Sequence, residues 1–139
     1  MIFLIDTNVL SEVRKGGRCD RNVAVWYESV DDGDLYVSVL ILGASRRGIE
    51  PLCRRDALQS AALERWLSRV DADFSDRILP IDRAVAEEWG RLSAVRTIPV
   101  ADGLLAATAR VHGIALATRN AADFTGLGVQ VLNPFAADG

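Results

Sequence analysis

Short apolar runs and longer stretches of helical spacing alternate along this chain. The runs lie at residues 2–5, 35–37, 78–81, 114–117 and 129–132, and each has the length of a buried strand. Between two of them, Leu63, Trp66, Leu67 and Val70 recur at i, i+3, i+4 and i+7, the spacing of an amphipathic helix. The pattern therefore predicts strands separated by helices.

Capping residues mark where these helices begin. Asp6 or Thr7, Ser38 and Asp82 each follow an apolar run and can cap a helix. We expect helices over residues 7–14, 22–30, 38–48 and 56–70, another from Asp82 through Leu92, and one starting near Asp102 and ending before Gly113. Strands that alternate with helices indicate an α/β fold, with a mainly parallel sheet of four to five strands and helices on both faces. No linker divides the chain, so we expect a single domain over residues 1–139.

Composition excludes several kinds of chemistry. The 139 residues carry a net charge of −3, and Lys15 is the only lysine among 16 basic residues, so a phosphate-binding loop with its Gly-Lys element is absent. Cys19 and Cys53 lie far apart and His112 is the only histidine, which excludes an ordinary zinc site. No apolar run approaches the roughly 18 residues of a membrane span, and we expect a cytoplasmic protein.

Polar residues that follow the strands are the candidate site groups. Ligands of parallel α/β sheets gather at the carboxyl ends of the strands. The residues placed there are Asp6, Thr7 and Asn8 after the first strand, Ser38 after the second, and Thr118, Arg119, Asn120 and Asp123 beyond the fourth. Asp102 opens the helix before the fourth strand and lies at the same end. Three carboxylates, Asp6, Asp102 and Asp123, are thus directed at one edge.

Such a group of acids favours a bound cation. Two carboxylates 4 Å apart repel by about 4 kcal/mol at an effective dielectric constant near 20, and all-oxygen ligands favour Mg²⁺ or Mn²⁺ over Zn²⁺. These ions polarise phosphoryl oxygens and activate water, as phosphodiester hydrolysis requires. Taken singly, Asp102 could be an ordinary helix cap and Asp123 a turn acid. Asp6 is different, since a carboxylate directly after a buried strand needs a partner.

Several segments, in their order along the chain, resemble PIN-domain proteins, and in particular the VapC/FitB-type toxins of prokaryotic toxin–antitoxin pairs. They are Phe3–Leu10 with Asp6-Thr7-Asn8-Val9, Ser38–Gly43, Arg46–Glu50, Val100–Asp102 with Ala106–Ala109, and Ala117–Asn120 with Asp123-Phe124. The resemblance implies a PIN-like three-layer sandwich and a Mg²⁺- or Mn²⁺-dependent endoribonuclease that works as a homodimer. It also implies inhibition by a cognate antitoxin, which itself binds operator DNA.

Carried over by position, Asp6, Asp102 and Asp123 match three acids of the family's metal site. Asn8, Ser38, Thr118 and Asn120 are the supporting polar residues.

One position departs from the family pattern. The family has Glu after the Leu-Gly of the third helix, whereas this chain has Ala44 after Leu42-Gly43, followed by Ser45. Glu50 is a poor substitute because six residues along a helix correspond to about 600° of rotation. We therefore expect weak metal binding and poor RNA cleavage, in a natural degenerate copy or a deliberately inactivated chain. The alternative function is a catalytically silent antitoxin-binding module that acts in assembly and operator regulation.

The arginines allow two interpretations. Arg46, Arg47 and Arg119 can contact RNA phosphates or an acid of the antitoxin, or they can be ordinary solvated residues. Because the net charge is negative, any RNA binding must use a local patch drawn from Arg14, Lys15, Arg18, Arg46, Arg47 and Arg119.

Two other α/β families begin in a comparable way but fit less well. A haloacid-dehalogenase-like phosphatase has a second Asp where this chain has Asn8. A receiver domain has a Lys after its last strand, whereas Lys15 lies early.

Overall fold

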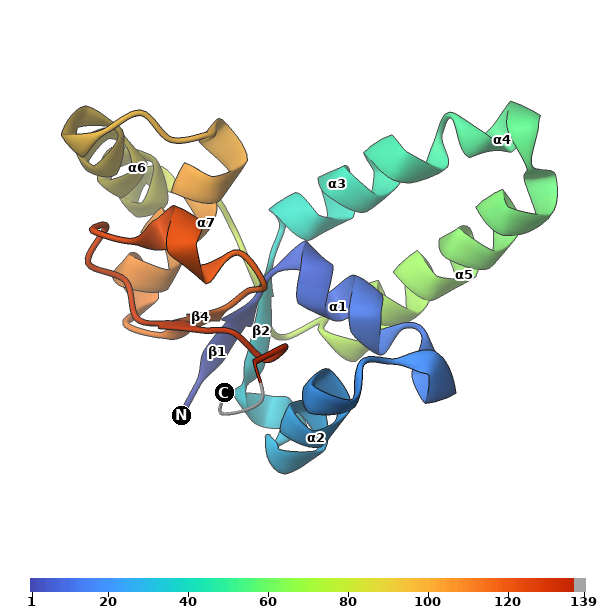
Figure 1. Ribbon diagram of the computed structural model, residues 1–139. Coiled ribbons are helices and arrows are strands. Elements are labelled where there is room, and N and C mark those ends of the chain that lie inside the picture. Colours follow the sequence, from blue (N-terminus) through green and yellow to red (C-terminus); the bar gives the residue numbers. More distant parts are fainter. Residues whose placement is uncertain (137–139) are drawn as a thin grey trace.

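A five-stranded parallel sheet forms the centre of the computed structural model, which describes residues 1–136 (Figure 1). The strands are β1 (Phe3–Ile5), β2 (Leu35–Ser38), β3 (Ile78–Leu79), β4 (Ala115–Ala117) and β5 (Val131–Leu132). Their order across the sheet is β3-β2-β1-β4-β5, and every neighbouring pair is parallel. The predicted α/β fold and its five strands are confirmed.

Helices connect the strands and cover both faces of the sheet. They are α1 (Thr7–Val13), α2 (Arg21–Ser29), α3 (Leu40–Ile49), α4 (Leu52–Arg55), α5 (Ala57–Asp73), α6 (Arg83–Val95) and α7 (Val100–His112). In Figure 1, α6 and α7 lie on one side of the sheet and α1 and α2 on the other, while α3, α4 and α5 form an arm that extends away from it. The helices on both faces that the pattern predicts, and the three layers that the family resemblance implies, are therefore present.

The central strand β1 supplies side chains to both halves of the core. Successive residues of a strand point to opposite faces, so Phe3 and Ile5 pack with α1, α2 and the end of α5, whereas Leu4 packs with α6 and α7. All three side chains are buried. This continuous burial explains why β1 reads as an unbroken apolar run rather than as an alternating one.

Some predicted boundaries were wrong by a few residues. The third helix begins at Leu40 rather than at Ser38, because Ser38 is the last residue of β2. The Ser38 hydroxyl still accepts a hydrogen bond from the backbone N–H of Leu40 at 3.1 Å. The last helix begins at Val100, so Asp102 is its third residue and does not cap it. The short helix α4, after Pro51, was not predicted. Asp6 and Asp82 cap their helices as expected.

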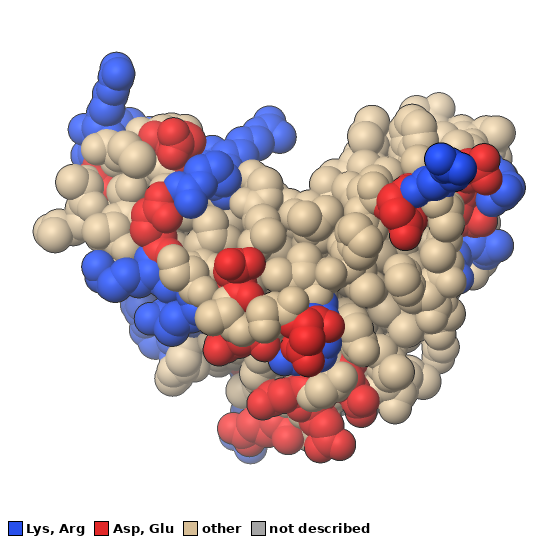
Figure 2. All heavy atoms as spheres, turned by 180° about the vertical axis from the view of Figure 1, so that it is seen from behind, with Lys and Arg blue, Asp and Glu red and all other residues tan. Residues whose placement is uncertain are grey.

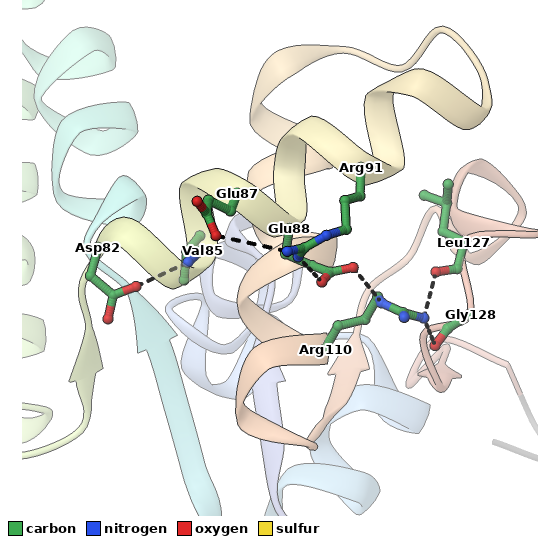
Figure 3. Close-up of polar contacts among 8 residues, drawn as sticks. All are labelled: Asp82, Val85, Glu87, Glu88, Arg91, Arg110, Leu127 and Gly128. Carbon is green, nitrogen blue, oxygen red and sulfur yellow. Dashed lines mark hydrogen bonds and ion pairs between the residues drawn. The ribbon is translucent and has the colours of Figure 1, made fainter.

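The pair α6 and α7 is tied to the segment that follows β4. Arg110 on α7 pairs with Glu88 on α6 (Nε–Oε1 3.1 Å) and donates to the backbone oxygens of Leu127 and Gly128, at 3.2 and 2.8 Å (Figure 3). Gly128 has φ +68°, a backbone conformation that favours glycine, and a Cβ there would lie 2.2 Å from Arg110 Nη1, so the guanidinium would have to move. Among residues 1–136, no helix is long and apolar enough to cross a membrane.

Candidate active site

Asp6 stands at the carboxyl end of β1 and joins this strand to α1 and β4. Its Oδ1 accepts the backbone N–H of Thr7 at 2.6 Å, and its Oδ2 accepts the hydroxyl of Thr118 at 2.8 Å. The Asn8 amide lies 3.5 Å from the same Oδ2. All these donors are neutral, and no ion pair within residues 1–136 includes Asp6.

Burial raises the pKa of Asp6 above its ordinary value of 3.8, and the hydrogen bonds from Thr118 and Thr7 only partly oppose this rise. The ionised carboxylate is therefore held in an environment that disfavours its charge. A cation at the unused lone pairs would offset this cost.

A pocket of about 420 Å³ opens beside Asp6. Its charged lining residues are Asp6, Asp102 and Arg47, and Ser38 adds a buried hydroxyl. The rest of the wall is largely apolar, with Ile5, Val39, Leu40, Ile41, Ala44, Ala101 and Leu105. The pocket thus combines residues from β1, the start of α3 and the first turn of α7, as the topology of a parallel sheet predicts.

Asp102 shares the electrostatic environment of the other two acids. Burial raises its pKa above 3.8, and the negative charges of Asp6 and Asp123 raise it further. The structure therefore brings Asp6 and Asp102 to one pocket and Asp123 within electrostatic range of Asp102. Asp123 is exposed and is not among the residues that line the pocket.

Asp123 lies in a short 3₁₀ turn, Ala121–Phe124, that an arginine holds in place. Arg96, at the end of α6, donates from Nη2 to the backbone oxygens of Asp123 and Thr125, at 2.6 and 3.2 Å. Arg96 was not identified from the sequence, and no local pattern could have found it, because its partners are backbone carbonyls 27 and 29 residues away.

The supporting polar residues form one network at the ends of β1 and β4. The buried Thr118 hydroxyl, which donates to Asp6, accepts the backbone N–H of Asn120 at 3.1 Å and lies 3.4 Å from the Asn8 amide. Asn8 Oδ1 in turn accepts the backbone N–H of Arg119 at 3.2 Å. These contacts fix the orientation of the Asp6 carboxylate. Asn120 takes part through its backbone, and its side chain is exposed.

Ala44 lies in the pocket wall, one position after Gly43. A carboxylate at this place would face the same space as Asp6 and Asp102. Glu50 does not line the pocket; its carboxylate lies 3.7 Å from Arg46 on the exposed side of α3. Within residues 1–136, no three Asp, Glu, His or Cys side chains stand together as a ready metal-binding group.

The three candidate arginines have different surroundings. Arg46 makes a two-pronged ion pair with Glu64 on α5, with Nη2–Oε2 at 3.0 Å. Arg47 lines the pocket, and no ion pair within the described residues includes it. Arg119 lies with its guanidinium carbon 4.9 Å from the centre of the Phe135 ring. Sequence reasoning treated Arg46 and Arg47 alike, whereas the structure separates them.

The sheet order and the helices on its two faces define an α/β protein with a carboxylate, Asp6, at the end of its central strand. The PIN domain family matches residues 3–126 of the chain, which covers most of its length. The chain therefore belongs to the PIN-domain family, as the sequence motifs indicated.

Relatives match almost the full length. The chain is 32% identical to Toxin FitB of Neisseria gonorrhoeae, over 96% of this chain and 99% of that protein. It is 31% identical to VapC ribonuclease Y4jK of Sinorhizobium fredii, over 96% and 98%. The crystal structure of FitAcB from Neisseria gonorrhoeae superposes with a TM-score of 0.85 at 31% identity, covering 96% of this chain and 99% of that one.

Proposed function

We propose that this protein is the toxin of a toxin–antitoxin pair and a divalent-metal-dependent endoribonuclease whose activity is reduced by Ala44. The observation that carries the proposal is the partly buried carboxylate of Asp6, which shares a pocket with Asp102 and, among residues 1–136, has only neutral hydrogen-bond donors. The names of the relatives, Toxin FitB and VapC ribonuclease Y4jK, support the toxin and ribonuclease assignments.

The residues present fit a hard divalent ion. Asp6 and Asp102 offer carboxylate oxygens at one pocket, and the negative charge of Asp123 acts on Asp102. Burial raises the pKa of both Asp6 and Asp102, so their negative charges are disfavoured, and a cation would offset this cost. Asp6 and Asp102 would hold Mg²⁺ or Mn²⁺ in their shared pocket, and the exposed Asp123 would add negative charge beside them. The ion would supply Lewis-acid stabilisation of charge on a phosphodiester. Thr118 and Asn8 orient the Asp6 carboxylate, and Arg47 places a positive charge at the pocket wall for an RNA phosphate.

We further propose a cognate antitoxin as partner, contact with operator DNA only through that antitoxin, a homodimeric state and a cytoplasmic location. Support for the antitoxin and the DNA comes from the structure of FitAB bound to an IR36 DNA fragment, which superposes with a TM-score of 0.82 at 29% identity over 97% of this chain and 96% of that one.

The decisive experiment replaces Ala44. Ala44→Glu restores a carboxylate to the pocket wall, and Ala44→Gln fills the same space without charge. Cleavage of single-stranded RNA in Mn²⁺ is expected to rise about tenfold or more for Ala44→Glu, in line with the effect of single groups at metal sites, and to remain at the wild-type level for Ala44→Gln. Calorimetric titration with Mn²⁺ should show tighter binding for Ala44→Glu and none for Asp6→Asn.

The alternative function is a catalytically silent antitoxin-binding module, and the presence of Ala44 in the pocket favours it. It predicts no cleavage by either the wild type or Ala44→Glu, together with no binding of Mn²⁺ to either. If the wild type cleaves RNA as fast as Ala44→Glu, the protein is a nuclease but the proposed impairment is wrong.

A further inference from the structure

One end of this protein is rich in acidic side chains. Figure 2 shows acidic side chains gathered at the bottom of the molecule, the end where α2 lies in Figure 1. Asp31 and Asp32, in the segment between α2 and β2, are both exposed. The candidate site lies at the opposite, carboxyl ends of the strands. A net charge of −3 therefore leaves room for a basic surface elsewhere.

A second hollow, of about 390 Å³, is lined by Arg14, Lys15 and Arg18 alone. Arg14 directly follows the last residue of α1, and Arg18 ends the 3₁₀ turn Gly16–Arg18 that comes next. Gly16 has φ +60°, a conformation that glycine adopts without strain, and it turns the chain between these residues. The sharp turn thus places three cationic side chains around one space.

Two of these charges have no acidic partner among the residues that the structure describes. Lys15 pairs with Glu12 at 3.0 Å, but no ion pair within residues 1–136 includes Arg14 or Arg18. The Arg14 guanidinium carbon lies 5.8 Å from the centre of the Trp66 ring, a contact that holds the side chain while leaving its charge unneutralised. Like charges around one hollow repel each other, so the hollow favours an anion.

Arg119 connects this hollow to the candidate active site. Its backbone N–H binds Asn8 beside Asp6. Its positive charge also reaches Glu12 near the other end of α1, where it helps the Lys15 hydrogen bond to hold the pKa of Glu12 below its ordinary value. The seven residues of α1 span about 10 Å at 1.5 Å per residue. Positive groups therefore follow α1 from the pocket to the hollow, over a length comparable to a few nucleotides.

We infer that the hollow formed by Arg14, Lys15 and Arg18 binds the phosphate backbone of single-stranded RNA beside the cleavage site, with Arg119 between the two. This inference rests on the proposed ribonuclease function and adds the path of the substrate. Guanidinium groups suit this task because they donate two hydrogen bonds to one phosphate. The Arg46 side chain is already paired with Glu64 and Glu50, and it does not contribute to the path.

The test measures binding of a labelled single-stranded RNA by fluorescence anisotropy. EDTA is present so that no cleavage occurs, and the salt concentration is varied. The test variant is Arg14→Gln/Arg18→Gln. The matched control is Arg54→Gln/Arg55→Gln, which removes two exposed arginines from α4 on the arm. Circular dichroism and thermal denaturation of each variant verify that it is folded.

Each phosphate contact contributes about 0.7 to the slope of log affinity against log salt for a single strand. The test variant should therefore lose about 1.4 from this slope, which corresponds to roughly 25-fold weaker binding at 0.1 M salt and little difference near 1 M. The control variant should bind like the wild type. Equal losses in the two variants would overturn the inference, because they indicate a general charge effect.

Two further outcomes separate this inference from the proposed function. If the test variant binds RNA normally but fails to bind the purified cognate antitoxin, the hollow is a protein contact and the inference is wrong. If neither the wild type nor any variant binds RNA, and Ala44→Glu does not cleave it, the ribonuclease function itself is wrong.

Discussion

Gly103 on α7 offers a sharp test of how the acid pocket is built, because it directly follows Asp102 and contacts α6. A Cβ at position 103 would lie 2.8 Å from Trp89 Cδ1 and 3.0 Å from both Trp89 Nε1 and Ile98 Cδ1. A Cβ at Gly90, in the middle of α6, would meet nothing within 4 Å. The two glycines thus differ in packing while both are helical.

The magnitudes follow from this difference. Gly→Ala in a helix interior stabilises by about 1 kcal/mol, whereas overpacking a tight contact costs about 1–3 kcal/mol. Gly90→Ala should therefore gain about 1 kcal/mol and Gly103→Ala should lose about 1 kcal/mol. The gap of about 2 kcal/mol reports the packing cost, since helix propensity contributes equally to both variants.

Urea denaturation measures this gap. With a slope near 2 kcal/mol per M, the two unfolding midpoints should differ by about 1 M. Because Trp89 and Ile98 must move away from the new methyl group, Gly103→Ala should also weaken Mn²⁺ binding at Asp102, while Gly90→Ala should not. Equal increases in the unfolding midpoints of the two variants would refute the reasoning.

Two further changes test neighbouring contacts. Glu12→Gln removes a carboxylate whose pKa is held below 4.5, chiefly by the hydrogen bond from Lys15. Thermal denaturation should show that the wild type is more stable than Glu12→Gln at pH 7, and that this difference disappears as the pH falls below about 4.5. A stability difference that persists in acid would contradict this prediction. Arg96→Met and Arg110→Met each remove two hydrogen bonds to backbone carbonyls, so both variants should be less stable than the wild type. Only Arg96→Met should weaken Mn²⁺ binding, because Arg96 holds the backbone of Asp123. Equal Mn²⁺ affinities by calorimetry would exclude that positioning role.

Much of the fold could be predicted because it is encoded in local patterns. The strand Phe3–Ile5 is entirely buried, so its sequence is continuously apolar, and Asp6 marks its end by capping the next helix. The short helix α4 was missed because four residues after Pro51 carry no measurable periodicity. The helix containing Asp102 was placed two residues late because Pro99 and Val100 begin it without a capping side chain.

The candidate site was only partly accessible from the sequence. Parallel topology was enough to bring Asp6 and Asp102 to one edge, since both follow from strand and helix order. The sequence could not show that Arg46 forms an ion pair whereas Arg47 lines the pocket. Adjacent helical residues project about 100° apart, and the position of α5, which supplies Glu64, decides which of the two is paired. The role of Arg96 also depends on tertiary structure alone.

The hydrogen bond between Thr118 and Asp6 joins residues 112 positions apart. Asp102 likewise comes late in the chain, so the pocket cannot assemble until most of the polypeptide has left the ribosome. For a protein proposed to destroy RNA, this order of synthesis delays the appearance of activity until translation of its own message is nearly complete. The wide separation of the acids along the chain therefore makes this pocket one of the last parts of the fold to be completed.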